Sequence, residues 1–112
     1  MKIAAHRIET RVSTAHVRVE HEGRVLAESD RAVELHEGAL PVRYYLPRED
    51  VRMDLLEPSP TRSHCPFKGD ASYFSAPGAR DAFWTYEQPI EGREDIAGLV
   101  APWPGRVEVV VE

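Results

Sequence analysis

Apolar residues in this chain recur at every second position, and this alternation limits the folds that it can adopt. The pattern is clear in AHVRVEH, residues 15–21, and in RVEVVVE, residues 106–112. A period of two is typical of a strand with one buried face, whereas an amphipathic helix has a period of 3.6. No stretch is long enough to supply the helix of a βαβ unit. The sequence therefore predicts an all-β domain of antiparallel strands with little helix.

Turn residues separate the predicted strands at intervals of roughly ten residues. Gly23 is expected to close a β-hairpin over residues 15–29, because glycine accepts a positive φ. Pro58 and Pro60 are expected to end a strand that begins at Asp50, because proline cannot donate to a ladder. Further strands are predicted in RAVELHEG, VRYYLP, ASYFS and AFWTYE, and one short helical turn in IEGREDIAGLV. This spacing is typical of a sandwich or barrel-like domain.

The chain of 112 residues fits a single domain that buries its own core. Residues 1–13 are expected to be its most loosely held part. The net charge of −5 argues against a nucleic-acid partner, since such proteins usually carry a basic face. No apolar run approaches the length of a membrane span, and MKIAAHRIET lacks the apolar core of a signal peptide. We therefore expect a cytoplasmic protein with no membrane association.

A single cysteine excludes an internal disulfide and a four-cysteine zinc site. The five histidines show no tight metal-ligand spacing, and no glycine-rich phosphate loop occurs. The sequence thus predicts neither a bound metal nor a cofactor.

Four segments together resemble a bacterial and fungal family known as domain of unknown function 427: GRVLAESDRAVEL, YYLPREDV, CPFKGDASYFS and FWTYEQPI. The resemblance covers about residues 15–111. It implies a β-tent-like fold, shared in outline by methionine sulfoxide reductase B and the ligand-binding domain of cereblon, in which two antiparallel sheets meet like the sides of a tent. Zinc usually joins the sheets of those relatives through four cysteines, which this chain lacks. The chain also departs from the family pattern at Pro102, where an aromatic residue is usual. The resemblance implies no settled activity.

The stretch TRSHCPFKGDASYF holds the lone cysteine, Cys65, and three interpretations of it remain open: catalysis, a structural turn, and ligand contact without catalysis. In the first, Cys65 is a catalytic nucleophile or redox thiol, with Lys68 and a histidine as helpers. In the second, Pro66 and Gly69 form a tight turn, Cys65 fills an apolar gap, and Lys68 is solvated or pairs with a carboxylate. Since neighbours on a strand point to opposite faces, His64 and Cys65 are expected to diverge.

The aromatic residues suggest a ligand site. Alternation places Trp84 and Tyr86 on one face of their strand, and a pocket lined by tryptophan and tyrosine suits a small planar or cationic ligand. We predict that Tyr45, Lys68, Tyr73 and Trp84 bind a ligand in one cleft, with Cys65 beside it. The leading hypothesis is a domain that binds a small polar or aromatic metabolite, and the alternative is an enzyme that uses Cys65.

The C-terminal strand carries valines on one face over residues 107–111. An uncovered strand of this kind at a sheet edge invites pairing with another chain. We therefore expect it to be either an inner strand or the contact of a homodimer.

Overall fold

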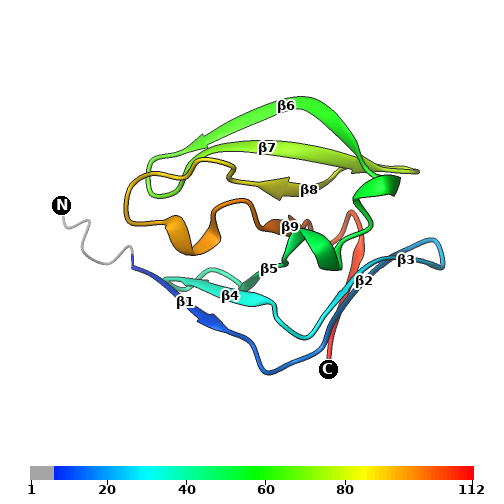
Figure 1. Ribbon diagram of the computed structural model, residues 1–112, viewed down its shortest axis with the longest axis horizontal. Coiled ribbons are helices and arrows are strands. Elements are labelled where there is room, and N and C mark those ends of the chain that lie inside the picture. The colour runs from blue at the N-terminus through cyan, green and yellow to red at the C-terminus, as the bar shows by residue number, and fades with distance from the viewer. Residues whose placement is uncertain (1–6) are drawn as a thin grey trace.

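Antiparallel strands joined by tight turns make up most of the structure (Figure 1). The computed structural model describes residues 7–112. The strands are β1 Ile8–Val12, β2 Val17–His21, β3 Arg24–Ser29, β4 Val33–Glu37, β5 Arg43–Tyr45, β6 Glu57–Cys65, β7 Gly69–Ala76, β8 Ala79–Thr85, β9 Val100–Pro102 and β10 Glu108–Val111. Single turns of 3₁₀-helix are η1 Arg48–Asp50, η2 Met53–Leu55 and η3 Glu94–Ile96. No α-helix occurs within the described residues, so the predicted all-β class is confirmed. None of their helical turns has the length and apolar character needed to cross a bilayer.

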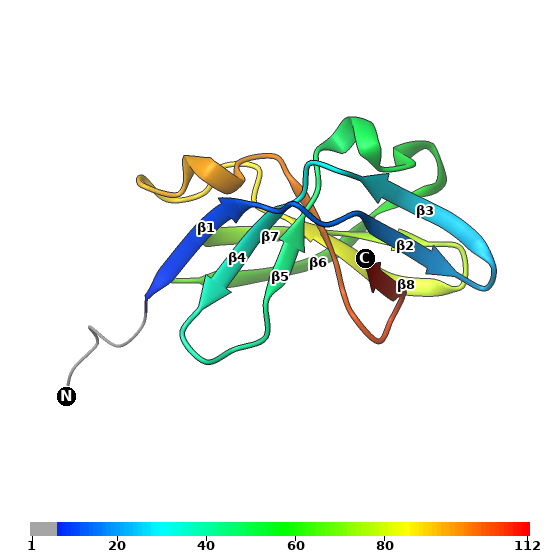
Figure 2. The same ribbon diagram turned by 90° about the horizontal axis from the view of Figure 1, so that it is seen from below.

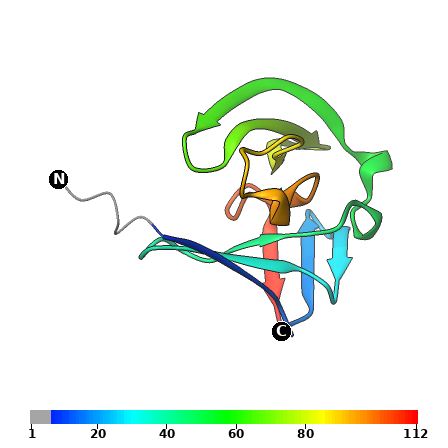
Figure 3. The same cartoon turned by 60° about the vertical axis from the view of Figure 1, so that its left-hand side comes forward.

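The strands form three antiparallel sheets in two layers. The smaller sheets, with strand orders β1-β4-β5 and β10-β2-β3, lie side by side (Figure 2). The four-stranded sheet, with the order β6-β7-β8-β9, arches over them (Figure 3). The tent-like arrangement implied by the family resemblance therefore has two sides. The four-stranded sheet forms one side, and the two smaller sheets together form the other.

Backbone hydrogen bonds between Leu46, directly after β5, and Val100, the first residue of β9, join the two layers. The N–H of Leu46 donates to the carbonyl of Val100 over 2.8 Å, and the N–H of Val100 donates to the carbonyl of Leu46 over 2.9 Å. Both residues are fully buried. The β1-β4-β5 sheet is thus attached to the four-stranded sheet along one line, and the side chains on either side of that line face each other.

Alternating apolar residues of the strands pack into two cores. The first contains fully buried side chains from both layers: Val17, Val19, Leu26, Leu46, Phe83 and Val100. The second contains Leu35 and Tyr45 from the β1-β4-β5 sheet and Ala71 and Ala101 from the four-stranded sheet. Burial of these side chains supplies the main driving force that holds the layers together.

The predicted hairpin over residues 15–29 is confirmed. β2 and β3 pair antiparallel, and the turn between them consists of Glu22 and Gly23, with φ values of 51° and 80°. Two successive residues with positive φ suit a type I′ turn, whose twist matches that of the flanking strands.

The strand expected from Asp50 to Pro60 is wrong. Its first part forms the turns η1 and η2, and its prolines lie inside β6 rather than after it. β6 is the outer strand of its sheet, with a bulge between Ser59 and Arg62, and an outer strand tolerates residues that cannot donate to a ladder. The alternation of Val51, Met53 and Leu55 belongs to the two short turns.

Both ends of the described chain lie at sheet edges. Residues 8–12 form β1, which pairs with β4 over all five of its residues, although residues 1–13 were expected to be loosely held. Residues 1–6 lie outside the described part of the chain. β10 pairs with β2 at the edge of its sheet, so the prediction of an inner strand is wrong and the homodimer contact stays a prediction.

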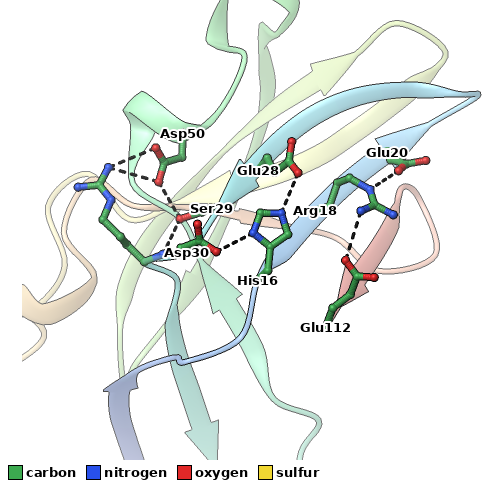
Figure 4. Close-up of polar contacts among 9 residues, drawn as sticks. His16, Arg18, Glu20, Glu28, Ser29, Asp30, Asp50 and Glu112 are labelled. Atoms are coloured by element: carbon green, nitrogen blue, oxygen red, sulfur yellow. Dashed lines mark hydrogen bonds and ion pairs between the residues drawn. The ribbon is translucent and has the colours of Figure 1, made fainter.

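Charged side chains form a network around the start of β2 (Figure 4). The ring of His16 has Nδ1 at 2.7 Å from Asp30 Oδ1 and Nε2 at 2.7 Å from Glu28 Oε2. Arg18 forms an ion pair with Glu112, the last described residue, with Arg18 Nη1 at 3.4 Å from Glu112 Oε1. The hydrogen bonds from Asp30 and Glu28 raise the pKa of His16 above its ordinary value, because they favour the imidazolium.

This raised pKa makes the stability of the fold depend on pH. The stabilisation from protonated His16 is full below the pKa of an unfolded histidine, about 6.5, and is lost as the pH rises through the higher value of the folded state. We expect the unfolding free energy of the wild type to fall, relative to that of His16→Gln, as the pH is raised from about 6 to about 9. Urea denaturation at a series of pH values measures this difference. A difference that is constant across the series would contradict it.

Candidate functional site

A cavity of about 340 Å³ lies between the β4–β5 hairpin and the four-stranded sheet. Its lining residues are Glu37, Leu40, Pro41, Arg43, Tyr45, Lys68, Tyr73, Trp84, Tyr86 and Trp103. These residues come from both layers, so the cavity depends on the way the sheets are joined.

The structure brings together the four residues predicted to bind a ligand. Tyr45 lies at the end of β5, Tyr73 on β7 and Trp84 on β8, and Lys68 lies in the turn between β6 and β7. Tyr73 and Trp84 are direct cross-strand partners, which explains their position side by side on one wall. Binding of a ligand by these residues stays a prediction.

The aromatic rings of the cavity form a continuous wall. The indole Nε1–H of Trp84 donates to the hydroxyl of Tyr45 over 3.0 Å, and the two rings meet edge to face with centroids 6.0 Å apart. Trp84 also meets Trp103 edge to face at 5.9 Å, and Trp103 lies 6.1 Å from Tyr73. Edge-to-face contacts of this kind are favourable beyond the area that they bury. The wall therefore has a defined shape.

The tyrosine hydroxyls of the cavity differ in their partners. Tyr45 accepts the bond from Trp84, and the Tyr73 hydroxyl lies 2.8 Å from Ser63 Oγ. The Tyr86 hydroxyl has no hydrogen-bond partner within the described residues. Burial raises the pKa of Tyr45 and of Tyr86, so both phenols stay protonated at neutral pH. Tyr86 thus offers the cavity an O–H donor.

The loop between β6 and β7 is the tight turn predicted from Pro66 and Gly69. The N–H of Lys68 donates to the carbonyl of Cys65 over 3.1 Å and closes the turn. Gly69 has a φ of 123°, and a Cβ at this position would lie 3.2 Å from the backbone nitrogen of Ile90. Both the conformation and the close approach favour glycine here. The Lys68 side chain, which this turn carries, lines the cavity.

Lys68 forms an ion pair with Glu37, the last residue of β4. Its Nζ lies 2.6 Å from Glu37 Oε1, and the two side chains are only 12% and 10% exposed. The sequence left open whether Lys68 assists Cys65, is solvated or pairs with a carboxylate, and the structure shows the pair. The two charges therefore largely offset each other within the cavity.

Arg43 supplies a positive charge that the sequence interpretation overlooked. Its side chain is half-buried, lines the cavity, and has no ion pair or hydrogen bond within residues 7–112. Glu37, Tyr86 and Trp103 were also missing from the predicted ligand-binding residues. Arg43 lies two residues before Tyr45, so the alternation of β5 already places both on one face. Trp103 lies in a loop, where no such pattern identifies it.

Cys65 lies at the end of β6 and is absent from the described lining of the cavity. It is half-buried and packs against the second core. His64 points away from it, as expected, and its Nδ1 lies 2.7 Å from Asp70 Oδ1 in an exposed ion pair. Catalysis by Cys65 stays an untested prediction.

No group of three or more His, Cys, Asp or Glu side chains among residues 7–112 is arranged to hold a metal ion. The described lining of the cavity instead offers aromatic faces, the Tyr86 hydroxyl and the Arg43 guanidinium. These groups suit non-covalent recognition of an organic molecule.

The Lys68–Glu37 pair gives a testable stability prediction. Removing the cationic partner of a largely buried carboxylate is costly, so we expect Lys68→Met to lower the unfolding free energy by about 3 kcal/mol. The matched control is Arg52→Met, because Arg52 pairs with Asp54 over 2.8 Å while both side chains are more than half exposed. That change is expected to cost less than about 1 kcal/mol. Equal losses in urea denaturation would contradict the structural role of Lys68.

Comparison with known families identifies the family of the chain. A family model described as a domain of unknown function, DUF427, matches residues 9–112, almost the entire chain. None of the curated proteins compared with the chain matches it.

Proposed function

The chain belongs to the DUF427 family, and because that description assigns no activity, we propose from the cavity itself that the protein binds a small planar molecule. The ring of the ligand packs against the aromatic wall formed by Tyr73, Trp84 and Trp103. Polar groups at the rim fix its orientation.

The observation that carries this proposal is the incomplete burial of the aromatic wall. Phe83, which belongs to the first core, is fully buried. Tyr73, Trp84 and Trp103 are each only half-buried, and all three line the same hollow. Aromatic surface left open to a hollow gains free energy when an apolar ring covers it.

The size of the cavity limits the ligand. Small-molecule sites in proteins usually span about 300 to 1,000 Å³. At about 340 Å³ the cavity lies at the lower end of that range. It suits a molecule of one or two rings with a small polar substituent.

The alternative function, an enzyme that uses Cys65, has less support. A nucleophilic thiol needs access to its substrate and a group that favours the thiolate. Cys65 packs against the second core, and its side chain has no hydrogen bond to a basic residue within the described part of the chain.

Intrinsic fluorescence tests the proposal. The chain has two tryptophans, and both line the cavity. We expect a panel of neutral and charged one- and two-ring molecules to contain members that change this fluorescence saturably and raise the melting midpoint, because a ligand selective for the folded state stabilises it.

A matched pair of variants separates the cavity from the rest of the protein. Tyr73 and Tyr44 are both half-buried tyrosines on strands, but only Tyr73 lines the cavity. Tyr73→Leu should weaken binding about five- to tenfold through the loss of an aromatic contact, whereas Tyr44→Leu should leave the dissociation constant unchanged. Absence of any saturable fluorescence change, or equal weakening in both variants, would refute the proposed function.

A further inference from the structure

We infer that the ligand is an anion, a planar ring bearing a carboxylate or phosphate group that Arg43 holds. This inference rests on the proposed function and adds the chemical class of the ligand.

The balance of charge in the cavity is the first support. Among residues 7–112, three charged side chains line it: Glu37, Arg43 and Lys68. Glu37 and Lys68 are bound to each other at 2.6 Å, so their charges offset. Arg43 remains as a net positive charge inside the cavity of a protein whose overall net charge is −5. The described lining of the cavity therefore carries a charge of opposite sign to the net charge of the chain.

The state of the Arg43 side chain is the second support. It is half-buried and makes no ion pair or hydrogen bond with any described residue. Elsewhere on the surface, Arg11, Arg31 and Arg52 all pair with carboxylates. A guanidinium presents a planar fork of donors that matches a carboxylate or phosphate in a bidentate manner. Arg43 is thus available for an anion that the protein itself does not supply.

A second donor lies in the same cavity. The Tyr86 hydroxyl has no partner within the described residues, and its raised pKa keeps it protonated. The Arg43 guanidinium can only donate hydrogen bonds, and the protonated Tyr86 hydroxyl can donate one. Two unsatisfied donors in one cavity favour a ligand rich in acceptors.

A cationic ligand, which the aromatic residues alone would also suit, fits the cavity less well. One face of the Trp103 ring is already covered by the guanidinium of Arg106, 3.6 Å from its centroid. Arg43 would repel a second cation, and Glu37 is already bound to Lys68. The aromatic wall is therefore expected to stack on a ring, with the negative substituent directed to Arg43.

The test compares probes that differ in charge but hardly in shape. Indolecarboxylate and the matching indolecarboxamide are titrated into the full chain by calorimetry at neutral pH. We expect the carboxylate to bind at least tenfold more tightly, because charge-assisted hydrogen bonds are about twice as strong as neutral ones. Benzoate and phenyl phosphate share one ring and, titrated in parallel, distinguish the source of the anion: tighter binding of phenyl phosphate indicates a phosphate ligand, and tighter binding of benzoate indicates a carboxylate. Either order supports an anionic ligand.

Matched arginine variants assign the preference to Arg43. Arg43→Gln should reduce the preference for the carboxylate over the amide to less than threefold. Arg24→Gln makes the same change in net charge at an exposed position outside the cavity, and it should retain the full preference. Arg43→Lys keeps the positive charge but loses the planar guanidinium, so it should retain part of the preference for the carboxylate. Melting curves of the three variants establish that each is folded.

The outcomes separate this inference from the proposed function. If the amide binds as tightly as the carboxylate, or if Arg43→Gln keeps the preference, the inference of an anionic ligand held by Arg43 is wrong. The proposal that the cavity binds a planar molecule is not affected by that result. If neither charged nor neutral ring compounds bind in the millimolar range, both the inference and the proposed function are wrong.

Discussion

The link between Leu46 and Val100 is the constraint on which the rest of the site depends. Its two backbone hydrogen bonds, at 2.8 and 2.9 Å, lie in a fully buried part of the structure. A buried backbone bond is costly to break, because the freed groups have no water to replace the lost partner. Tyr45 directly precedes this link. The link therefore holds the Tyr45 hydroxyl within 3.0 Å of the Trp84 indole, across the boundary between the two layers.

The polar interactions around the cavity complement this link. The Lys68–Glu37 pair ties the turn after β6 to the end of β4, so it too connects the two layers. By satisfying each other, these two charges leave Arg43 as the uncompensated charge among the lining residues. The cavity consequently combines a rigid aromatic wall with one available cation, and this combination gives a ligand both a preferred shape and a preferred charge.

Much of the architecture could be predicted because strand alternation and turn chemistry are local. The β2–β3 hairpin and the turn after Cys65 each depend on a few neighbouring residues. The same reasoning failed over η1 and η2, because apolar residues spaced by two also fit short turns with one side packed on a core. It also failed for β10, since the neighbours of a strand depend on the whole sheet order. The partner of Lys68 could not be predicted, because Glu37 lies 31 residues away in sequence.

If the aromatic cavity receives a planar ligand, the two indole N–H groups of the chain report its binding. Both tryptophans line the cavity, and only the Trp84 N–H is bonded to Tyr45. In a proton–nitrogen NMR titration with indolecarboxylate, the account predicts that both indole signals shift saturably, with cross-relaxation between their rings and the ligand ring. Unmoved indole signals under conditions where backbone signals elsewhere shift would place binding outside the cavity and contradict the account.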